Sequence, residues 1–138
     1  MPDIINKNDI PVTESEDKLS VIFALQKALD TDIASRRGLD FTPEQWIQKD
    51  VLAMLSELAE LLDEVNFKWW KNPKPIDSPA LQGELVDILH FFISMCIRAG
   101  MDADKLYEGY IAKNKENFDR QYGRSAKKGY DVNDMKEV

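Results

Sequence analysis

Residues 85–97 read "LVDILHFFISMCI", the longest apolar stretch in a chain of 138 residues. The stretch contains the polar residues Asp87 and His90. It is too short and too polar to span a membrane, which takes about 20 apolar residues. A Ser-Pro pair at 78–79 and Gly100 mark the two ends of a predicted helix whose apolar side chains cover nearly its whole circumference. A helix that is apolar all round must be buried all round.

Three other segments have helical periodicity between capping residues. Residues 18–37 follow Thr13 and Glu16, which fit a capping box, and Gly38 fits a left-handed terminator. These signals predict the first helix of the fold.

The second and fourth helices also have defined starts. Thr42, Pro43 and Gln45 predict an N-cap, a first-turn proline and a capping-box partner, and the turn-rich "KNPKPIDSP" stops that helix. Asp102 is expected to cap a helix over 103–121. No window alternates as a strand does, so we expect an all-α fold, an antiparallel bundle of four to five helices joined by short connections.

Composition places the chain among ordinary cytoplasmic domains. With 43% hydrophobic and 31% charged residues, residues 1–138 are expected to form a single domain, with 1–12 and 128–138 loosely held. Cys96 is the only cysteine, which favours a reducing compartment, and no secretory signal is visible. The net charge of -7 argues against a nucleic-acid binder.

The apolar third helix also bears on assembly. Four helices offer few surfaces with which to enclose it, so we expect a homodimer or a larger homo-oligomer. The alternative is a central helix that its own chain wraps completely.

Paired carboxylates lie on two of the predicted core helices. Glu57 and Glu60 are three residues apart, and so are Glu84 and Asp87, which places each pair on one helix face. Like charges at this spacing cost roughly 0.2 to 0.5 kcal/mol per pair. For one such pair, a solvated acidic face is the simpler interpretation. Two pairs on facing helices would converge where water is scarce, and oxygen-only ligands then favour Mg²⁺ or Mn²⁺.

A basic stripe follows on the fourth helix. Lys113, Asn117 and Arg120 fall at i, i+4 and i+7, so they share a face. Lysine and arginine suit phosphate oxygens, and asparagine offers both a donor and an acceptor. Surface ion pairing is the alternative for this stripe.

Two further segments offer polar groups among apolar ones. In the first helix, Gln26 and Asp30 share a face with apolar side chains, and Gln26 is either a core amide or a ligand contact. Between the second and third helices, "NFKWWKN" brings together the aromatic residues Phe67, Trp69 and Trp70 and the lysines Lys68 and Lys71. These aromatics either pack or stack on a nucleoside, and the neighbouring lysines would reach phosphate.

Together these residues resemble a known superfamily. The order "ELAE", 23 residues and "ELVD" resembles the E-x-x-E, spacer, E-x-x-D signature of the all-α NTP pyrophosphatases, which include MazG-like proteins and dimeric dUTPases. The dimeric dUTPase family is the nearer resemblance, on "FALQKALD", "ELAELLDEVNFKWWK", "ELVDILHFFIS" and "YIAKNKENFDRQYGRSAKKGY", over roughly residues 18–130.

The resemblance implies Mg²⁺-dependent hydrolysis of the nucleotide dUTP to dUMP and pyrophosphate. Its metal ligands would be Glu57, Glu60, Glu84 and Asp87, with Glu57 and Glu60 as catalytic residues and Glu57 polarising the attacking water. The implied substrate contacts are Gln26, Asp30, Lys68, Trp70, Lys113, Asn117, Arg120 and Tyr130. Asp30 stands where many relatives have asparagine.

Two alternatives remain open. One is a pyrophosphatase of the same superfamily that acts on dCTP or a non-canonical nucleotide. The other is a helical interaction protein without enzymatic activity, in which the acidic faces are solvated and the third helix is an oligomerisation surface.

Overall fold

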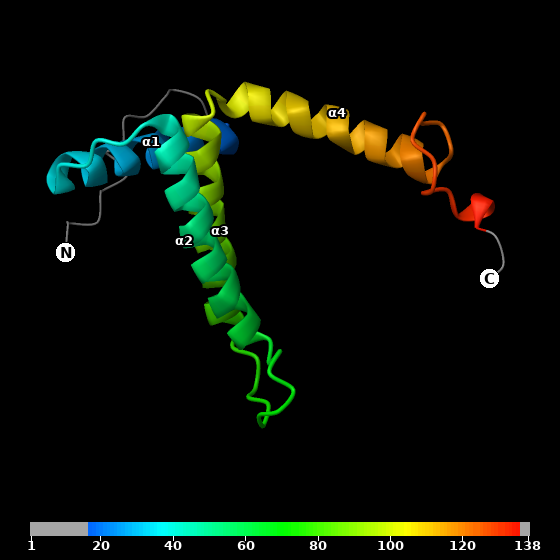
Figure 1. Ribbon diagram of the computed structural model, residues 1–138, viewed down its shortest axis with the longest axis horizontal. Helices are drawn as coiled ribbons and strands as arrows, with labels where there is room; N and C mark the ends of the chain where they lie inside the picture. The colour runs from blue at the N-terminus through cyan, green and yellow to red at the C-terminus, as the bar shows by residue number, and fades with distance from the viewer. Residues whose placement is uncertain (1–16, 136–138) are drawn as a thin grey trace. The chain divides into compact units, whose positions relative to one another are not determined.

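A computed structural model describes residues 17–135 of the chain. Its elements are α1 (Lys18–Arg37), α2 (Pro43–Glu64), α3 (Ser78–Arg98), α4 (Ala103–Gln121) and a short 3₁₀ helix, η1 (Val132–Asp134) (Figure 1). Between residues 17 and 135 no strand is formed. The predicted all-α fold is therefore confirmed.

The helix ends follow the capping residues closely. Gly38 ends α1 with φ 60, the left-handed conformation predicted for it. Asp17 caps the start of α1 by accepting from the backbone N–H of Ser20. The capping box expected at Thr13 and Glu16 lies outside the described residues.

At α2 the predicted capping box is present. The hydroxyl of Thr42 accepts from the backbone N–H of Gln45 at 3.2 Å, and the Gln45 side chain accepts from the N–H of Thr42 at 3.0 Å. Helix α3 begins at Ser78 as expected, and Asp77 caps it by accepting from the N–H of Ala80 at 3.1 Å. Local side-chain chemistry therefore sets where the helices that carry the glutamates begin.

The backbone contacts divide the described residues into two compact units, one that ends at Asp102 and one that begins at Ala103. In the first unit α2 runs antiparallel to α3 and packs along it, and α1 packs against α3 (Figure 1). Phe23, Ile93 and Cys96 are its buried hydrophobic residues. Burial raises the pKa of the Cys96 thiol, as is typical of a cysteine that packs in the core.

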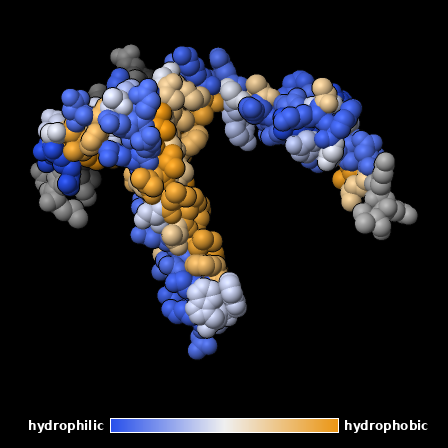
Figure 2. Space-filling view, viewed as in Figure 1, coloured by the Kyte–Doolittle hydropathy of each residue, from blue (hydrophilic) through white to orange (hydrophobic). Residues whose placement is uncertain are grey.

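The surface of the α2–α3 pair is rich in apolar side chains, as Figure 2 shows for one face. Leu52 and Leu55 on α2 are 67% and 55% exposed, and Leu85 and Val86 on α3 are 51% and 53% exposed. Helix α3 is thus not buried all round in this structure. Its enclosure by a partner chain remains a prediction.

By length and composition, α3 is the one helix in residues 17–135 that could cross a membrane, with a mean hydropathy of 1.4. The apolar run of residues 85–97 is shorter than the whole helix, which has 21 residues. This is weak evidence for a membrane span, because core helices of globular proteins pass the same test.

Candidate functional site

Three carboxylates meet between α2 and α3. Glu57 and Glu60 lie one turn apart on α2, and Glu84 lies on α3. One carboxylate oxygen from each lies within 4.8 Å of the other two. The three-residue spacing puts the α2 pair on one face, and the antiparallel pairing with α3 brings Glu84 opposite that face.

The cluster is electrostatically strained in the absence of a cation. Oε2 of Glu57 and Oε2 of Glu84 are both buried without a hydrogen-bond partner. Contact with the Glu57 carboxyl, followed by burial and the charge of Glu60, raises the pKa of Glu84 to about 7. Carboxylate oxygens packed this way are costly unless a proton or a cation compensates them.

These donors fit a hard divalent cation. All three are carboxylates, the ligand type that Mg²⁺ and Mn²⁺ take in proteins, and two of them have a buried oxygen with no other partner. Glu57, Glu60 and Glu84 are therefore the residues that would hold Mg²⁺. Asp87, the fourth predicted ligand, is exposed one turn further along α3 and lies outside this group of three.

Asp87 instead lines a pocket of about 310 Å³ between α1, α2 and α3. Glu57 lines the same pocket, so the pocket reaches the carboxylate cluster. The predicted contacts Gln26 and Asp30 line it from α1, together with the buried Asp50 of α2. The structure thus places two of the predicted substrate contacts beside the glutamates.

A hydrogen-bond network fixes the α1 side of this pocket. Nε2 of Gln26 donates to Oδ1 of Asp30 at 2.9 Å, and the hydroxyl of Ser94 donates to Oδ2 of Asp30 at 2.8 Å. Gln26 and Ser94 are only 7% and 3% exposed. Ser94 was missed in the sequence, although a hydroxyl inside the most apolar helix was a visible signal.

Asp50 lines the same pocket from α2. It is buried, and its Oδ2 has no hydrogen-bond partner. Burial raises the pKa of its carboxyl, and the charge of Asp30 adds to this, while Ser94 and Arg98 act in the opposite direction. In the sequence, Asp50 precedes Glu57 by seven residues, a spacing that places both on one face of α2.

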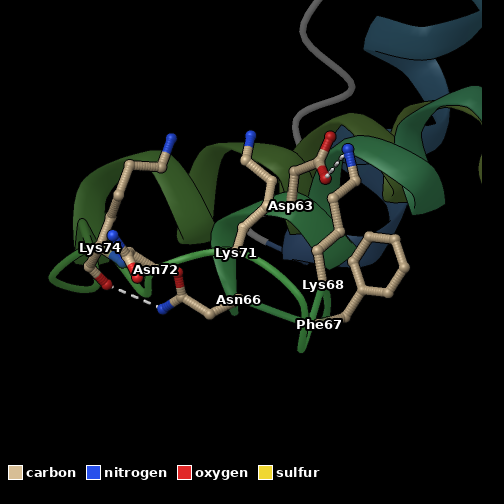
Figure 3. A pocket seen from close by; sticks show the side chains of 7 residues that line it. All are labelled: Asp63, Asn66, Phe67, Lys68, Lys71, Asn72 and Lys74. Atoms are coloured by element: carbon tan, nitrogen blue, oxygen red, sulfur yellow. Dashed lines mark hydrogen bonds and ion pairs between the residues drawn. The ribbon is translucent and has the colours of Figure 1, made fainter.

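The loop that joins α2 to α3 carries the predicted contacts Lys68 and Trp70. Nζ of Lys68 lies 3.5 Å from Oδ1 of Asp63, at the edge of a pocket of about 170 Å³ (Figure 3). Trp69 and Trp70 are 85% and 60% exposed, with their rings edge to face at 4.6 Å. Both indoles are therefore available to a ligand.

The remaining predicted contacts belong to the second unit. Lys113 and Asn117 are exposed on α4. Arg120 pairs with Glu116 at 3.0 Å and lies over the ring of Tyr130, with 5.4 Å to its centroid. The roles of these residues toward a nucleotide remain predictions.

Ser125 and Arg120 hold the pKa of Glu116 below its ordinary value. The hydroxyl of Ser125 donates to the same oxygen of Glu116 that pairs with Arg120. The segment that follows α4 is therefore tied back to the helix within the second unit.

Comparison with known proteins identifies a family. A family model described as dUTPase matches residues 18–105. A dCTP pyrophosphatase of Enterobacteria phage T4 is 32% identical over 53% of this chain and 51% of its own length. A dCTP pyrophosphatase of Enterobacteria phage LZ5 is 32% identical over 54% of this chain and 43% of its own length.

The chain thus spans about half the length of these relatives. A DNA replication protein of phage T4 is 30% identical over 49% of this chain and 21% of its own length. No solved structure matches the chain significantly.

Proposed function

We propose that this chain, which belongs to the dUTPase family whose model matches residues 18–105, is a Mg²⁺-dependent pyrophosphatase. It hydrolyses dUTP to dUMP and pyrophosphate. The oxygen of a water molecule bonds to one of the two phosphorus atoms that the α–β bridging oxygen joins. The bond between that phosphorus and the bridging oxygen breaks. The displaced oxygen stays with the leaving fragment. The water's proton passes to a carboxylate of the site and then to solvent.

The observation that supports this proposal most is the carboxylate cluster. Glu57, Glu60 and Glu84 bring three ligand oxygens within 4.8 Å of one another, and two of these residues have a buried oxygen without a hydrogen-bond partner. Bound Mg²⁺ would neutralise the phosphates and lower the pKa of a water molecule.

The protein's own side chains supply position and proton transfer. Glu57 belongs both to the cluster and to the adjoining pocket. We therefore assign to Glu57 the role of the base that accepts the proton of the attacking water. The pocket at Gln26 and Asp30 would hold the nucleoside, and Trp70 would border the base. Orientation of this kind makes a large contribution to such reactions.

A nucleotide panel tests the activity. Pyrophosphate release is measured with Mg²⁺ for dUTP, dCTP and the other deoxynucleoside triphosphates. We expect dUTP to be hydrolysed, and hydrolysis to stop when the metal is chelated. Glu84→Gln should lower kcat/KM by more than the roughly 10- to 100-fold that loss of an outer-shell metal partner costs.

Glu44→Gln is the matched control for this experiment. Glu44 is an exposed glutamate in the first turn of α2, far from the cluster along the helix, so its removal should leave kcat/KM unchanged. Wild-type protein that releases no pyrophosphate from any nucleotide would refute the proposed activity.

The second candidate substrate is dCTP. Two relatives are named dCTP pyrophosphatases, and Asp30 lines the pocket with a carboxylate whose oxygens only accept hydrogen bonds when ionised. Cytosine carries an amino donor where uracil carries an oxygen acceptor, and this difference favours cytosine beside a carboxylate. Turnover of dCTP ahead of dUTP in the panel would select this candidate.

The assembly and the location complete the proposal. We propose a homodimer or a larger homo-oligomer, supported by the exposed apolar side chains of α2 and α3, and a cytoplasmic location, supported by the membership of a nucleotide-metabolism family.

A further inference from the structure

One side chain closes the loop between α2 and α3. Asn66 has φ 58, a left-handed conformation that asparagine adopts more readily than most residues. Its Nδ2 donates to the carbonyl oxygen of Lys74 at 2.8 Å (Figure 3), and its Oδ1 accepts from the Lys74 N–H at 2.8 Å. Two hydrogen bonds to one residue fix both the distance and the orientation of the loop's two ends.

The clamped loop presents three lysines to one pocket. Lys68, Lys71 and Lys74 all line it, and the backbone N–H of Lys71 donates to the carbonyl oxygen of Lys68 at 3.1 Å. In Figure 3 the ammonium groups of Lys71 and Lys74 point to the same side of the loop as the Asp63–Lys68 pair. The fold of the loop therefore gathers positive charge in one place.

This positive charge is only partly neutralised. Lys68 pairs with Asp63, the one carboxylate of the pocket lining, whereas Lys71 and Lys74 form no ion pair within residues 17–135. The chain as a whole has a net charge of -7. A local excess of cations on an acidic protein marks a place where an anion is favoured.

The size and the place of the pocket indicate which anion. Its volume of about 170 Å³ is below the roughly 300 to 1,000 Å³ of ordinary ligand pockets, so it suits a small ion better than a whole nucleotide. Asp63 follows Glu60 by one turn on α2, a rise of about 4.5 Å. Asp63, which lines the pocket, is therefore one helical turn beyond Glu60 of the glutamate cluster along α2.

We propose that Lys71 and Lys74 bind the pyrophosphate portion of the substrate, and the pyrophosphate product, and that Asn66 is the positioning residue for both lysines. This inference rests on the proposed function, because it assigns a site to the leaving group of that reaction. Ammonium groups bind phosphate oxygens through charge-assisted hydrogen bonds. The nucleoside would occupy the separate pocket at Gln26 and Asp30.

The double variant Lys71→Gln/Lys74→Gln tests the site directly. We expect the inhibition constant for pyrophosphate to rise about tenfold or more, as loss of hydrogen bonds to charged groups implies, and KM for the nucleotide to rise with it. Titration calorimetry with pyrophosphate alone should show the same loss of affinity. The control Lys18→Gln/Lys27→Gln removes the same charge from exposed positions of α1 and should change neither constant.

Asn66→Gly separates positioning from folding. Glycine tolerates the positive φ, so this variant removes only the amide clamp. We expect weaker pyrophosphate inhibition in Asn66→Gly with the wild-type kcat for saturating nucleotide, a split that a merely destabilised protein would not show. Asn66→Asp, which still accepts from the Lys74 N–H, should lie between Asn66→Gly and wild type.

The outcomes separate this inference from the proposed function. Active wild-type enzyme whose double lysine variant keeps the wild-type inhibition constant would overturn the pyrophosphate site and leave the activity standing. Wild-type protein without activity that still binds pyrophosphate through Lys71 and Lys74 would support the anion site and refute the proposed reaction.

Discussion

The free-energy cost of ionising Glu84 depends on the groups that surround its carboxylate. Contact with Glu57, burial and the charge of Glu60 raise its pKa to about 7, from an ordinary value of 4.5. Between these two values the folded protein holds a proton that the unfolded chain has released. The free energy of unfolding of the metal-free protein must therefore fall as the pH rises through this window.

We expect metal-free protein to have a higher Tm at about pH 5.5 than at about pH 7.5, by thermal denaturation monitored by circular dichroism. Glu116 and Asp119, whose pKa values are lowered, lose their stabilising charge only below their ordinary values of 4.5 and 3.8 and so act outside this window. Added Mg²⁺ should raise Tm more at the higher pH, because protons and metal compete for the same oxygens.

Glu84→Gln provides the control for the pH effect. Without the third carboxyl this contribution to the pH dependence disappears, and the metal-free variant should be more stable than wild type at neutral pH. Equal pH dependence in the variant and in wild type would show that Glu84 does not hold the proton.

At the scale of the element, the start of α2 depends on two hydrogen bonds between Thr42 and Gln45. Thr42→Ala removes the hydroxyl that accepts from the Gln45 N–H and should lower the free energy of unfolding by about 0.5 to 2 kcal/mol in urea denaturation. The kcat should stay unchanged, since Glu57 lies about 22 Å further along the helix.

Thr31→Ala in α1 is the matched substitution with the opposite expectation. The Thr31 hydroxyl donates to the carbonyl oxygen of Lys27 within the helix, an interaction that slightly destabilises helices, and alanine is the better helix former. Destabilisation of equal size in both variants would mean that the Thr42 cap contributes nothing specific.

Elements whose cause is local could be predicted from the sequence. The α2 capping box, the Gly38 terminator and the shared face of Glu57 and Glu60 all follow from residues within four positions of one another. Asn66 and Ser94 could not be found this way. Their partners, Lys74 and Asp30, lie 8 and 64 residues away, so their roles exist only once the helices have packed.

The same distinction applies to Asp87, whose role as a metal ligand remains a prediction. Its spacing from Glu84 puts both residues on one face of α3, but the packing of α2 decides which turn of that face meets Glu57 and Glu60. Glu84 meets them, and Asp87 falls one turn away beside the pocket. Sequence spacing determines which face of a helix a residue is on. Tertiary packing determines which residues of that face meet the neighbouring helix.

At the scale of the whole molecule, an acidic chain must bind a polyanionic substrate. A net charge of -7 repels a triphosphate at a distance, so affinity has to come from local sites of opposite sign. The carboxylate cluster can acquire such a sign only with bound cations, whereas the Lys71 and Lys74 pocket has it from its own side chains. Activity should therefore depend on both the metal and the loop.

The apolar exterior of α2 and α3 leads to the prediction about assembly. Leu52 and Leu55 lie three residues apart on α2 and are 67% and 55% exposed, and burying one leucine stabilises by roughly 1.5 to 3 kcal/mol. In a two-fold symmetric dimer each such contact occurs twice. We expect sedimentation equilibrium to give at least twice the 15.9 kDa of one chain.

Leu52→Glu/Leu55→Glu should shift the protein to the mass of a single chain, because each glutamate would have to be desolvated in the interface. Val132→Glu, at a position 66% exposed in η1, tests whether any added charge has this effect and should leave the oligomer intact. A wild-type mass of one chain at all measured concentrations would refute the oligomer. Dissociation without loss of helical circular dichroism would show that the apolar face serves assembly and that the α2–α3 pair folds without it.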